Sequence, residues 1–492
     1  MATTVSRLFR LPNEVLLHIF TIAASDSEFM SGRRVNDRRT CIALSRTCRR
    51  FHSIATLVLY RDLNMCASRY NWNSLLLRRA TRCLHRTLKE KPELRKHCSL
   101  LSIDLGYSTN SAVLVPYLMD LAVWLTHTKT LRIDGRFKGG EEELLLSKAA
   151  VQHMPMLEGV SLLNGLDLRQ VYETVSCLSH LRVLELSGTS APHDPLLWNA
   201  FEEGTSPITS LIIRGFRDSP GILRHLVAWP AKLEHFSFTE CDDEASRVWG
   251  LPIIACIIAP HRATLRSITV SSLPEKGLAD FDLTGFENLK HLSLSSWVTG
   301  FAEGDETNLL APRLTSFRWV FTLEQQHSES LLDFGEVQEH WLRRFIAEAI
   351  ARGLPLRDID IRYAPDRFYL PTDLPEIYPW DRMESIERDF QDKGIKLSWT
   401  FPTISREHYR EVSKPQEEGE DMDMWFTDGD EEGDEENGSD VSEGSEGGYG
   451  YFPFQSNTLM NYCRRNEDGT MPLKETRPTF IQLTYPTIYA GS

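Results

Sequence analysis

The sequence predicts an α/β protein in which a small helical region precedes a long array of strand and helix units. Three observations lead to this prediction. From about residue 98 to 400, a short phrase with apolar residues at its first, fourth and sixth positions recurs. Residues 11–20 and 41–60 contain instead two strongly apolar segments with helical spacing. Residues 416–450 are acidic and poor in apolar residues, which predicts a disordered segment.

Composition places the chain among proteins that bury a core. It has 492 residues, 41% of them hydrophobic and 25% charged, enough for roughly two to four domains. The formal net charge is −15, and the acidic segment with its fifteen Asp and Glu and no Lys or Arg accounts for all of it. The remainder is nearly neutral, which gives no argument for binding nucleic acid.

Cysteine usage and hydropathy indicate the cytosol or the nucleus. The nine cysteines occur singly and form no C-x-x-C pair, as is typical of a reducing compartment and not of a disulfide or zinc module. The apolar stretches are too short for a membrane helix. Residues 1–24 superficially resemble a secretion signal or a transit peptide, but Asn13, Glu14 and His18 interrupt the apolar run.

The first apolar segment, LPNEVLLHIF at 11–20, begins as helices do. Pro12 has a φ suited to a first helical turn and needs no hydrogen bond there. Glu14 interacts favourably with the positive end of the helix dipole. The helix then carries more apolar residues than one face can bury, namely Val15, Leu16, Leu17, Ile19, Phe20 and Ile22.

The second apolar segment, CIALSRTCRRFHSIATLVLY at 41–60, has apolar residues at spacings of three and four. They are Cys41, Leu44, Cys48, Phe51, Ile54 and Val58. Two short helices packed on each other use only part of this surface. Each further Leu-sized side chain that is covered contributes roughly 1.5–3 kcal/mol. We therefore expect a partner protein or the first repeat to cover the rest.

Four separated motifs in these helices resemble the F-box family. They occur in the family's order and are Leu11-Pro12-x-Glu14, Ile19-Phe20, Cys48-Arg49-x-Phe51 and Leu59-Tyr60-Arg61. The similarity extends over residues 11–63, and the expected domain over residues 1–63. The segment 21–40 is longer than the family's usual connector, so a polar loop is expected there.

This resemblance implies docking onto the Skp-type adaptor of a cullin-based ubiquitin ligase. The adaptor-binding residues that it implies are Leu11, Pro12, Glu14, Val15, Leu16, Ile19, Phe20 and Leu44. Cys48, Phe51 and Ile54 are expected to pack between the helices. The implied role is that of a substrate receptor in a Skp–cullin–F-box ligase. A scaffold that binds the adaptor without delivering substrates is the alternative.

The recurring phrase predicts the strands of the array. Its copies begin at residues 98, 128, 157, 181, 208, 233, 265, 289, 314, 356 and 395. Segments with helical spacing lie between them, such as 141–154, 167–178 and 337–353. Units this short must stack on their neighbours to bury a face, which predicts an open, curved solenoid over residues 98–400. Residues 64–97 are expected to form a helical linker, with a helix at 74–90.

The phrase resembles the L-x-x-L-x-L portion of leucine-rich repeats. The Asn that follows it in that family is missing, since Gly165, Thr189, Trp297 and Ala364 stand in its place. Irregular turns are therefore expected. Another α/β array, including an eight-fold barrel, remains an alternative.

On a leucine-rich strand, the residues between the core positions point to the concave face. We expect a protein substrate to bind there, at Arg132, Glu185, Arg214, His235, His291, Arg318, Asp358, Asp360 and Arg362, with Ser237, Thr269 and Ser293 between them. A solvated sheet face would have the same pattern.

Catalytic motifs are missing from the sequence. It contains no phosphate-binding loop, no H-E-x-x-H, no G-x-S-x-G and no His or Cys at metal-ligand spacing. We therefore expect neither catalysis nor a cofactor, metal, nucleic acid or membrane. If the array were a barrel enzyme, the best candidates would be the carboxylates near strand ends, Asp104, Asp134, Glu240 and Asp360.

The acidic segment at 416–450 has two possible roles. It is either a solvated spacer or an interaction tail with Trp425 and Phe426 as anchors. The C-terminal tail at 451–492 regains aromatic and β-branched residues and is a candidate for docking onto the solenoid.

Overall fold

The structure, a computed structural model, divides the chain into two units, and all the described residues belong to the first (1–28 and 34–413). The described residues are 10–25, 38–66, 74–104, 113–134, 141–163, 166–189, 201–216, 218–239, 249–271, 273, 277–278, 280–321, 330–365 and 376–412. The predicted acidic segment and C-terminal tail lie outside these ranges. None of the helices within them is long and apolar enough to span a bilayer.

Three helices form the N-terminal part. They are α2 (Asn13–Ser25), α3 (Arg38–Ser45) and α4 (Arg49–Arg61). Their apolar faces enclose a small core of their own, which we call the helical core: Leu16, Phe20, Ala24, Cys41, Phe51, Ile54, Ala55 and Val58. The Phe20 and Phe51 rings meet edge to face with centroids 5.2 Å apart, which fixes α2 on α4.

The rest of the described chain is one parallel sheet of twelve strands in sequence order. The strands are β1 (Asp62–Cys66), β2 (Leu100–Asp104), β3 (Thr130–Asp134), β4 (Gly159–Leu162), β5 (Val183–Ser187), β6 (Ser210–Arg214), β7 (His235–Thr239), β8 (Ser267–Val270), β9 (His291–Ser295), β10 (Ser316–Val320), β11 (Asp358–Arg362) and β12 (Lys396–Trp399). Among these strands, β1 pairs only with β2 and β12 only with β11. The sheet is therefore open, and the alternative of a closed eight-fold barrel is wrong.

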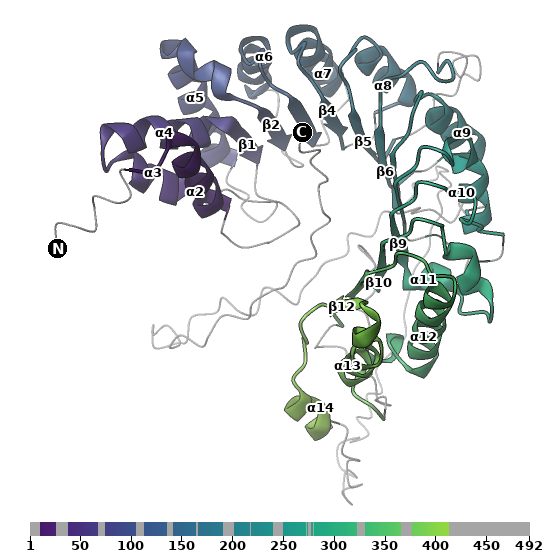
Figure 1. Cartoon of the computed structure of the whole chain (residues 1–492). Coiled ribbons are helices and arrows are strands. Elements are labelled where there is room, and N and C mark those ends of the chain that lie inside the picture. The colour runs from purple at the N-terminus through teal and green to yellow at the C-terminus, as the bar shows by residue number, and fades with distance from the viewer. Residues whose placement is uncertain are drawn as a thin grey trace, which may run out of the picture. The chain divides into compact units, whose positions relative to one another are not determined.

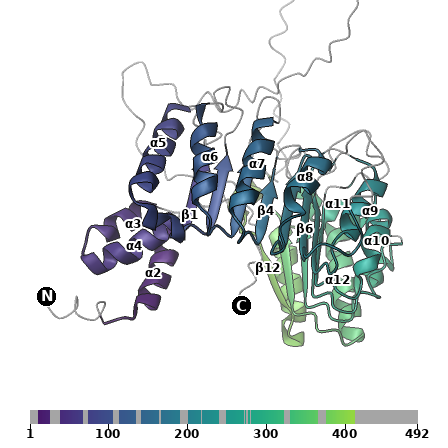
Figure 2. The ribbon, with the colours of Figure 1, turned by 90° about the horizontal axis from the view of Figure 1, so that it is seen from above.

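Helices lie between most of the strands, along one face of the curved sheet, its convex side (Figure 1). The described residues contain none between β5 and β6 or between β8 and β9, and α14 follows the last strand. The α-helices are α5 (Ser74–Glu90), α6 (Val115–Trp124), α7 (Glu141–His153), α8 (Leu168–Val175), α9 (Pro220–Ala228), α10 (Leu251–Ile258), α11 (Ser296–Thr299), α12 (Glu336–Ala351), α13 (Pro379–Phe390) and α14 (Arg406–Val412). Figure 2 shows α5, α6 and α7 side by side over the first strands. Short 3₁₀ turns add to them: η1 (Pro92–His97), η5 (Ala259–His261), η6 (Asp305–Leu309), η7 (Leu331–Asp333) and η8 (Gln391–Lys393).

The prediction of the repeated phrase is confirmed, because each of its eleven copies overlaps one strand, β2 to β12. The predicted helices at 74–90, 141–154, 167–178 and 337–353 correspond to α5, α7, α8 and α12. The array is consistent with leucine-rich-repeat-like units. One strand was missed: β1 lies partly inside the segment expected to be a helical linker, because its only apolar alternation is Leu63 and Met65.

Strand alternation decides which side chains are buried. The second and fourth residues of each strand face the helices, as Phe236 and Phe238 do in β7, and join one core that runs from Leu63 to Tyr409. The first, third and fifth residues lie on the opposite, concave face. Strand pairing is in register throughout, so residues at these positions form three rows across the sheet.

The helical part joins the sheet without a connector. Helix α4 ends at Arg61 and β1 begins at Asp62. The Ser99 amide donates a 2.8 Å hydrogen bond to the carbonyl of Arg61, and Tyr60 packs against the large core. Helix α4 also contacts η1. These contacts fix α4 relative to the first two strands.

Candidate functional site

Arg50 of α4 holds the start of α2. Its Nε donates a 2.8 Å hydrogen bond to Oδ1 of Asn13, and its Nη2 donates to the carbonyl of Leu11. On the same helix, Cys48 caps the N-terminus by accepting from the Phe51 amide at 3.4 Å. The LPNE motif and the Cys-Arg-x-Phe motif are therefore in contact, although about forty residues separate them in sequence.

Helix α2 presents an apolar stripe that no described segment covers. Val15, Ile19 and Ile22 are 42%, 41% and 52% exposed. Their spacing of four and three residues puts them on one side of the helix. Three β-branched aliphatic side chains this exposed on thirteen residues are more than scattered surface hydrophobics, and they indicate an interaction site. On α3, Ile42 is exposed as well.

The eight residues implied to bind the adaptor divide into three groups. Pro12, Glu14, Val15 and Ile19 are exposed. Leu11 and Leu44 are half-buried and pack against the helical core, whereas Leu16 and Phe20 belong to that core. The buried residues can therefore only support the surface from behind. Ile22 was not among the eight, although it lies seven residues after Val15 and its spacing was a sufficient signal.

The nine candidate substrate-binding residues all lie on the concave face. His235, His291 and Asp358 are at first positions of their strands, and Arg214 and Arg362 at fifth positions. The third-position row holds Arg132, Glu185, Arg318 and Asp360.

Ion pairs connect most of the charged side chains on this face. Arg214 Nε lies 3.2 Å from Oε1 of Glu185, whose other oxygen accepts from Ser161 Oγ at 2.7 Å. Arg318 Nε and Arg362 Nε each lie 2.8 Å from the same oxygen of Asp360. One carboxylate thus holds two guanidinium groups, and the cluster keeps one positive charge.

The two histidines lie in the same row, with Ser267 of β8 between them. Burial is the main cause that lowers the pKa of each imidazole below its ordinary value. Charged neighbours act as well: Lys290 lowers the pKa of His291 further, whereas at His235 Glu234 raises the pKa and Arg266 lowers it. Both side chains are therefore mostly neutral at pH 7.

Three of the four carboxylates named as enzyme candidates lie in the described ranges. Asp104 and Asp134 are buried and paired in register on β2 and β3. Asp360 is engaged by its two arginines, and Glu240 lies outside the described residues. In the described ranges, no three His, Cys, Asp or Glu side chains come together as metal ligands.

A comparison with protein families agrees with the geometry of the helical part. Residues 8–66 match the family described as F-box-like, a range that contains α2, α3, α4 and β1. A comparison with curated proteins finds no match. An F-box-like domain implies binding to a Skp-type adaptor of a cullin ligase. Proteins with such a domain are typically non-catalytic and intracellular. The chain therefore carries an F-box-like domain at residues 8–66, followed by a long all-parallel α/β sheet consistent with leucine-rich-repeat-like units.

Proposed function

We propose that this protein is the substrate-recognition subunit of a Skp–cullin–F-box ubiquitin ligase. The observation that carries the proposal is the uncovered stripe of Val15, Ile19 and Ile22 on a domain that matches the F-box-like family. The stripe and exposed Pro12 and Glu14 contact the adaptor, while Leu16 and Phe20 support them from the helical core. The concave face of the sheet holds the substrate protein.

The mechanism requires positioning and no nucleophile on this chain. Tethering a substrate beside the ubiquitin-carrying enzyme raises the effective concentration of its lysines. It also replaces a bimolecular encounter by a nearly intramolecular step. Such a gain depends on a stiff connection between the two binding surfaces. The direct passage from α4 into β1, with the Ser99 to Arg61 hydrogen bond beside it, supports this requirement.

The expected location is the cytosol or the nucleus, where the ligase core acts, and no cofactor or metal takes part. A scaffold that binds the adaptor without promoting turnover uses the same stripe, so adaptor binding alone does not distinguish the two roles.

The test uses affinity capture of the full chain and of a Val15→Ala, Ile19→Ala, Ile22→Ala variant, followed by mass spectrometry. The adaptor and cullin should be captured with the unmodified chain and lost with the variant, while substrates remain with both. Half-lives of the shared partners are then measured in cells with and without the protein. If the variant lost all other partners together with the adaptor, a separate substrate surface would be contradicted. If the half-lives of the shared partners did not change on removal of the protein, the scaffold would be favoured over the substrate receptor.

A further inference from the structure

A row of basic residues precedes the strands at the amino end of the concave face. Arg182, Arg266, Lys290 and Arg357 each stand directly before the first residue of β5, β8, β9 and β11, and all four are exposed. We call these four residues the basic edge. Backbone hydrogen bonds align their positions along the sheet. From Thr209, which precedes β6, to Arg357, the residue directly before each strand donates its amide to the carbonyl of the residue directly before the previous strand, at 2.7–2.9 Å.

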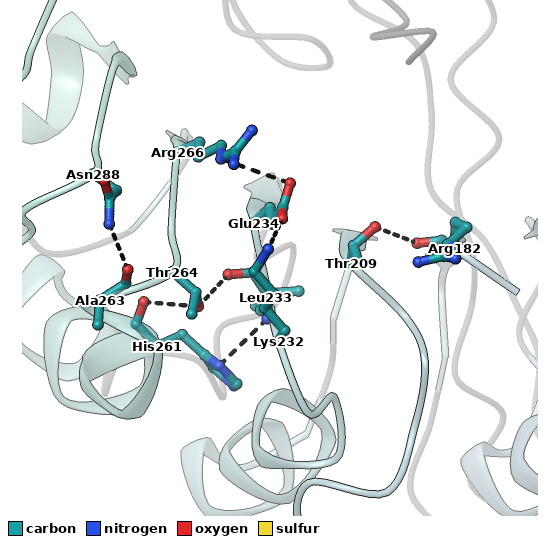
Figure 3. A network of polar contacts seen from close by, with 10 residues as sticks. All are labelled: Arg182, Thr209, Lys232, Leu233, Glu234, His261, Ala263, Thr264, Arg266 and Asn288. Atoms are coloured by element: carbon teal, nitrogen blue, oxygen red, sulfur yellow. Dashed lines mark hydrogen bonds and ion pairs between the residues drawn. The ribbon is translucent and has the colours of Figure 1, made fainter. Parts of the chain in front are cut away.

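Side chains of the loops stabilise the same edge (Figure 3). Thr264 Oγ1 donates to the carbonyl of Leu233 at 2.7 Å, and Asn288 Nδ2 donates to the carbonyl of Ala263 at 2.7 Å. Each bond joins one repeat to the repeat before it. The basic edge is therefore held at a fixed spacing of roughly 4.8 Å per strand.

Charge on the concave face changes sign along the sheet when the edge and the three rows are taken together. Around β1 to β4 there are three cationic side chains and four carboxylates: Arg61, Lys129 and Arg132 against Asp62, Asp104, Asp134 and Glu158. Around β5 to β12 there are eight cationic side chains and four carboxylates: Arg182, Arg214, Arg266, Lys290, Arg318, Arg357, Arg362 and Lys396 against Glu185, Glu234, Asp358 and Asp360. The later part of the face thus has an excess of four positive charges.

The carboxylates of this later part are largely engaged by the chain itself. Glu185 and Asp360 hold the arginines of the concave rows, as described above. Glu234 accepts from Lys232, and Arg266 lies 3.7 Å away. Within the described part of the chain, Arg182, Lys290 and Arg357 form no ion pair. The described residues therefore leave these three charges unpaired. Lys232 and Arg266 share the single carboxylate of Glu234, so that this group also keeps one positive charge.

Of the two histidines, His291 lies in the more positive surroundings. Burial is the largest cause of its lowered pKa, and Lys290 and Arg318 lower the pKa further, against a smaller opposite effect of Asp358. At His235 burial again comes first, but Glu234 raises the pKa more than Arg266 lowers it. The cations that oppose protonation of His291 would equally favour a nearby carboxylate.

Short hydroxyl side chains form the middle of the face between Arg214 of β6 and Arg318 of β10. Those at the first and third strand positions are Ser237, Ser267, Thr269 and Ser293. Small side chains leave room for another backbone, and hydroxyl groups can donate hydrogen bonds to carboxylates. The four strand spacings between the two arginines amount to roughly 19 Å, the length of about six extended residues.

We propose that the basic edge and the concave face of β5 to β12 bind an acidic segment of the substrate protein, rich in Asp and Glu. Carboxylates of the segment pair with Arg266 and Lys290 and accept from the hydroxyl groups beside them. This proposal rests on the proposed function only in calling the bound protein a substrate. The surface would bind the acidic segment whether or not that protein is then ubiquitinated.

The experiment measures fluorescence anisotropy of labelled peptides of about twelve residues with the full chain, in about 0.05 and 0.3 M salt. One peptide alternates Glu and Ala, a second has Gln for Glu, and a third is the Gln peptide with one phosphoserine. The Glu peptide should bind at least about tenfold more tightly than the Gln peptide and lose affinity in the higher salt. The chain's own acidic residues 416–450 are the same in every arm.

Two variants place the interaction on the sheet. Arg266→Ala with Lys290→Ala should weaken binding of the Glu peptide roughly five- to tenfold, since surface ion pairs are individually modest. Arg224→Ala with Arg388→Ala removes two exposed cations from the helices α9 and α13 and should change nothing. The proposal is overturned if the Gln peptide binds as tightly, if only the phosphorylated peptide binds, or if the two variants behave alike.

Adaptor binding is measured on the same samples. Intact adaptor binding without discrimination between the Glu and Gln peptides would refute the acidic-segment proposal alone. Discrimination between the peptides without adaptor binding would refute the proposed ligase function alone.

Discussion

The apolar stripe of α2 gives the sharpest quantitative test. Replacing Val15, Ile19 and Ile22 by alanine removes most of its apolar area, because these side chains are 42%, 41% and 52% exposed. Alanine is the best helix former, so α2 should persist. The helical core should also persist, since Leu16, Phe20 and Ala24 are unchanged.

The expected magnitude follows from the area that an adaptor would cover. Full burial of such a side chain contributes roughly 1.5–3 kcal/mol, and about half of each remains available. Complete coverage of the three would contribute about 2–4 kcal/mol. Alanine retains the β-carbon, so the triple variant should lose about 2–3 kcal/mol, a rise in the dissociation constant of roughly 30- to 150-fold.

Isothermal titration of the purified full chain with a Skp-type adaptor measures this change. The matched control replaces three exposed apolar residues of the sheet-covering helices α6, α7 and α12: Val123, Leu145 and Val337, which are 40%, 57% and 58% exposed. Thermal unfolding of both variants verifies that they fold. Equal affinities of the triple variant and the unmodified chain would refute the role of the stripe, and so would an equal loss in the control.

Three further predictions concern the folded chain. Phe51→Ala removes the ring packed on Phe20 and should lower the free energy of unfolding by about 3–5 kcal/mol, measured by urea denaturation. Burial keeps the pKa of the His235 imidazole low, so the folded state binds fewer protons than the unfolded state below pH about 6.5. Stability should therefore fall with decreasing pH, and urea titrations at neutral and mildly acidic pH should show a smaller fall in His235→Gln. Burial raises the pKa of the Cys98 thiol to about 12, so iodoacetamide followed by mass spectrometry should leave it unmodified in the folded chain. The exposed cysteines should react: Cys83, Cys177 and Cys256.

The strands were predictable because packing one face of each strand on helices makes apolar and polar residues alternate in the sequence. A strand packed on helices must place apolar residues at its second and fourth positions, and the phrase LRVLEL does so with Leu184 and Leu186. The strand β1 has the same arrangement, but its five residues, DLNMC, contain only Leu63 and Met65 as a signal. Its place became visible only through its pairing with β2.

The motifs of the helical part were predictable from order and spacing, whereas the ion pairs of the concave face were not. Arg318 and Asp360 are 42 residues apart in sequence, and only the adjacency of β10 and β11 brings them within 2.8 Å. From the sequence alone, both residues were candidates for contact with the substrate, and nothing indicated that they pair with each other. The structure pairs them with each other, whereas Arg182, Lys290 and Arg357 of the basic edge form no ion pair within the described residues.

The connection between the two surfaces follows from how α4 enters the sheet. A rotation of the helical part relative to the sheet would have to break the pairing of β1 with β2 or the hydrogen bond from Ser99 to Arg61, because no linker stands between them. The distance from the stripe to a bound segment is therefore set by the number of strands. Seven spacings separate β1 from β8, which amounts to roughly 34 Å along the sheet. A substrate anchored by Arg266 and Lys290 would accordingly be held at a fixed offset from the adaptor, and only its own flexible parts would search for the ubiquitin-carrying enzyme.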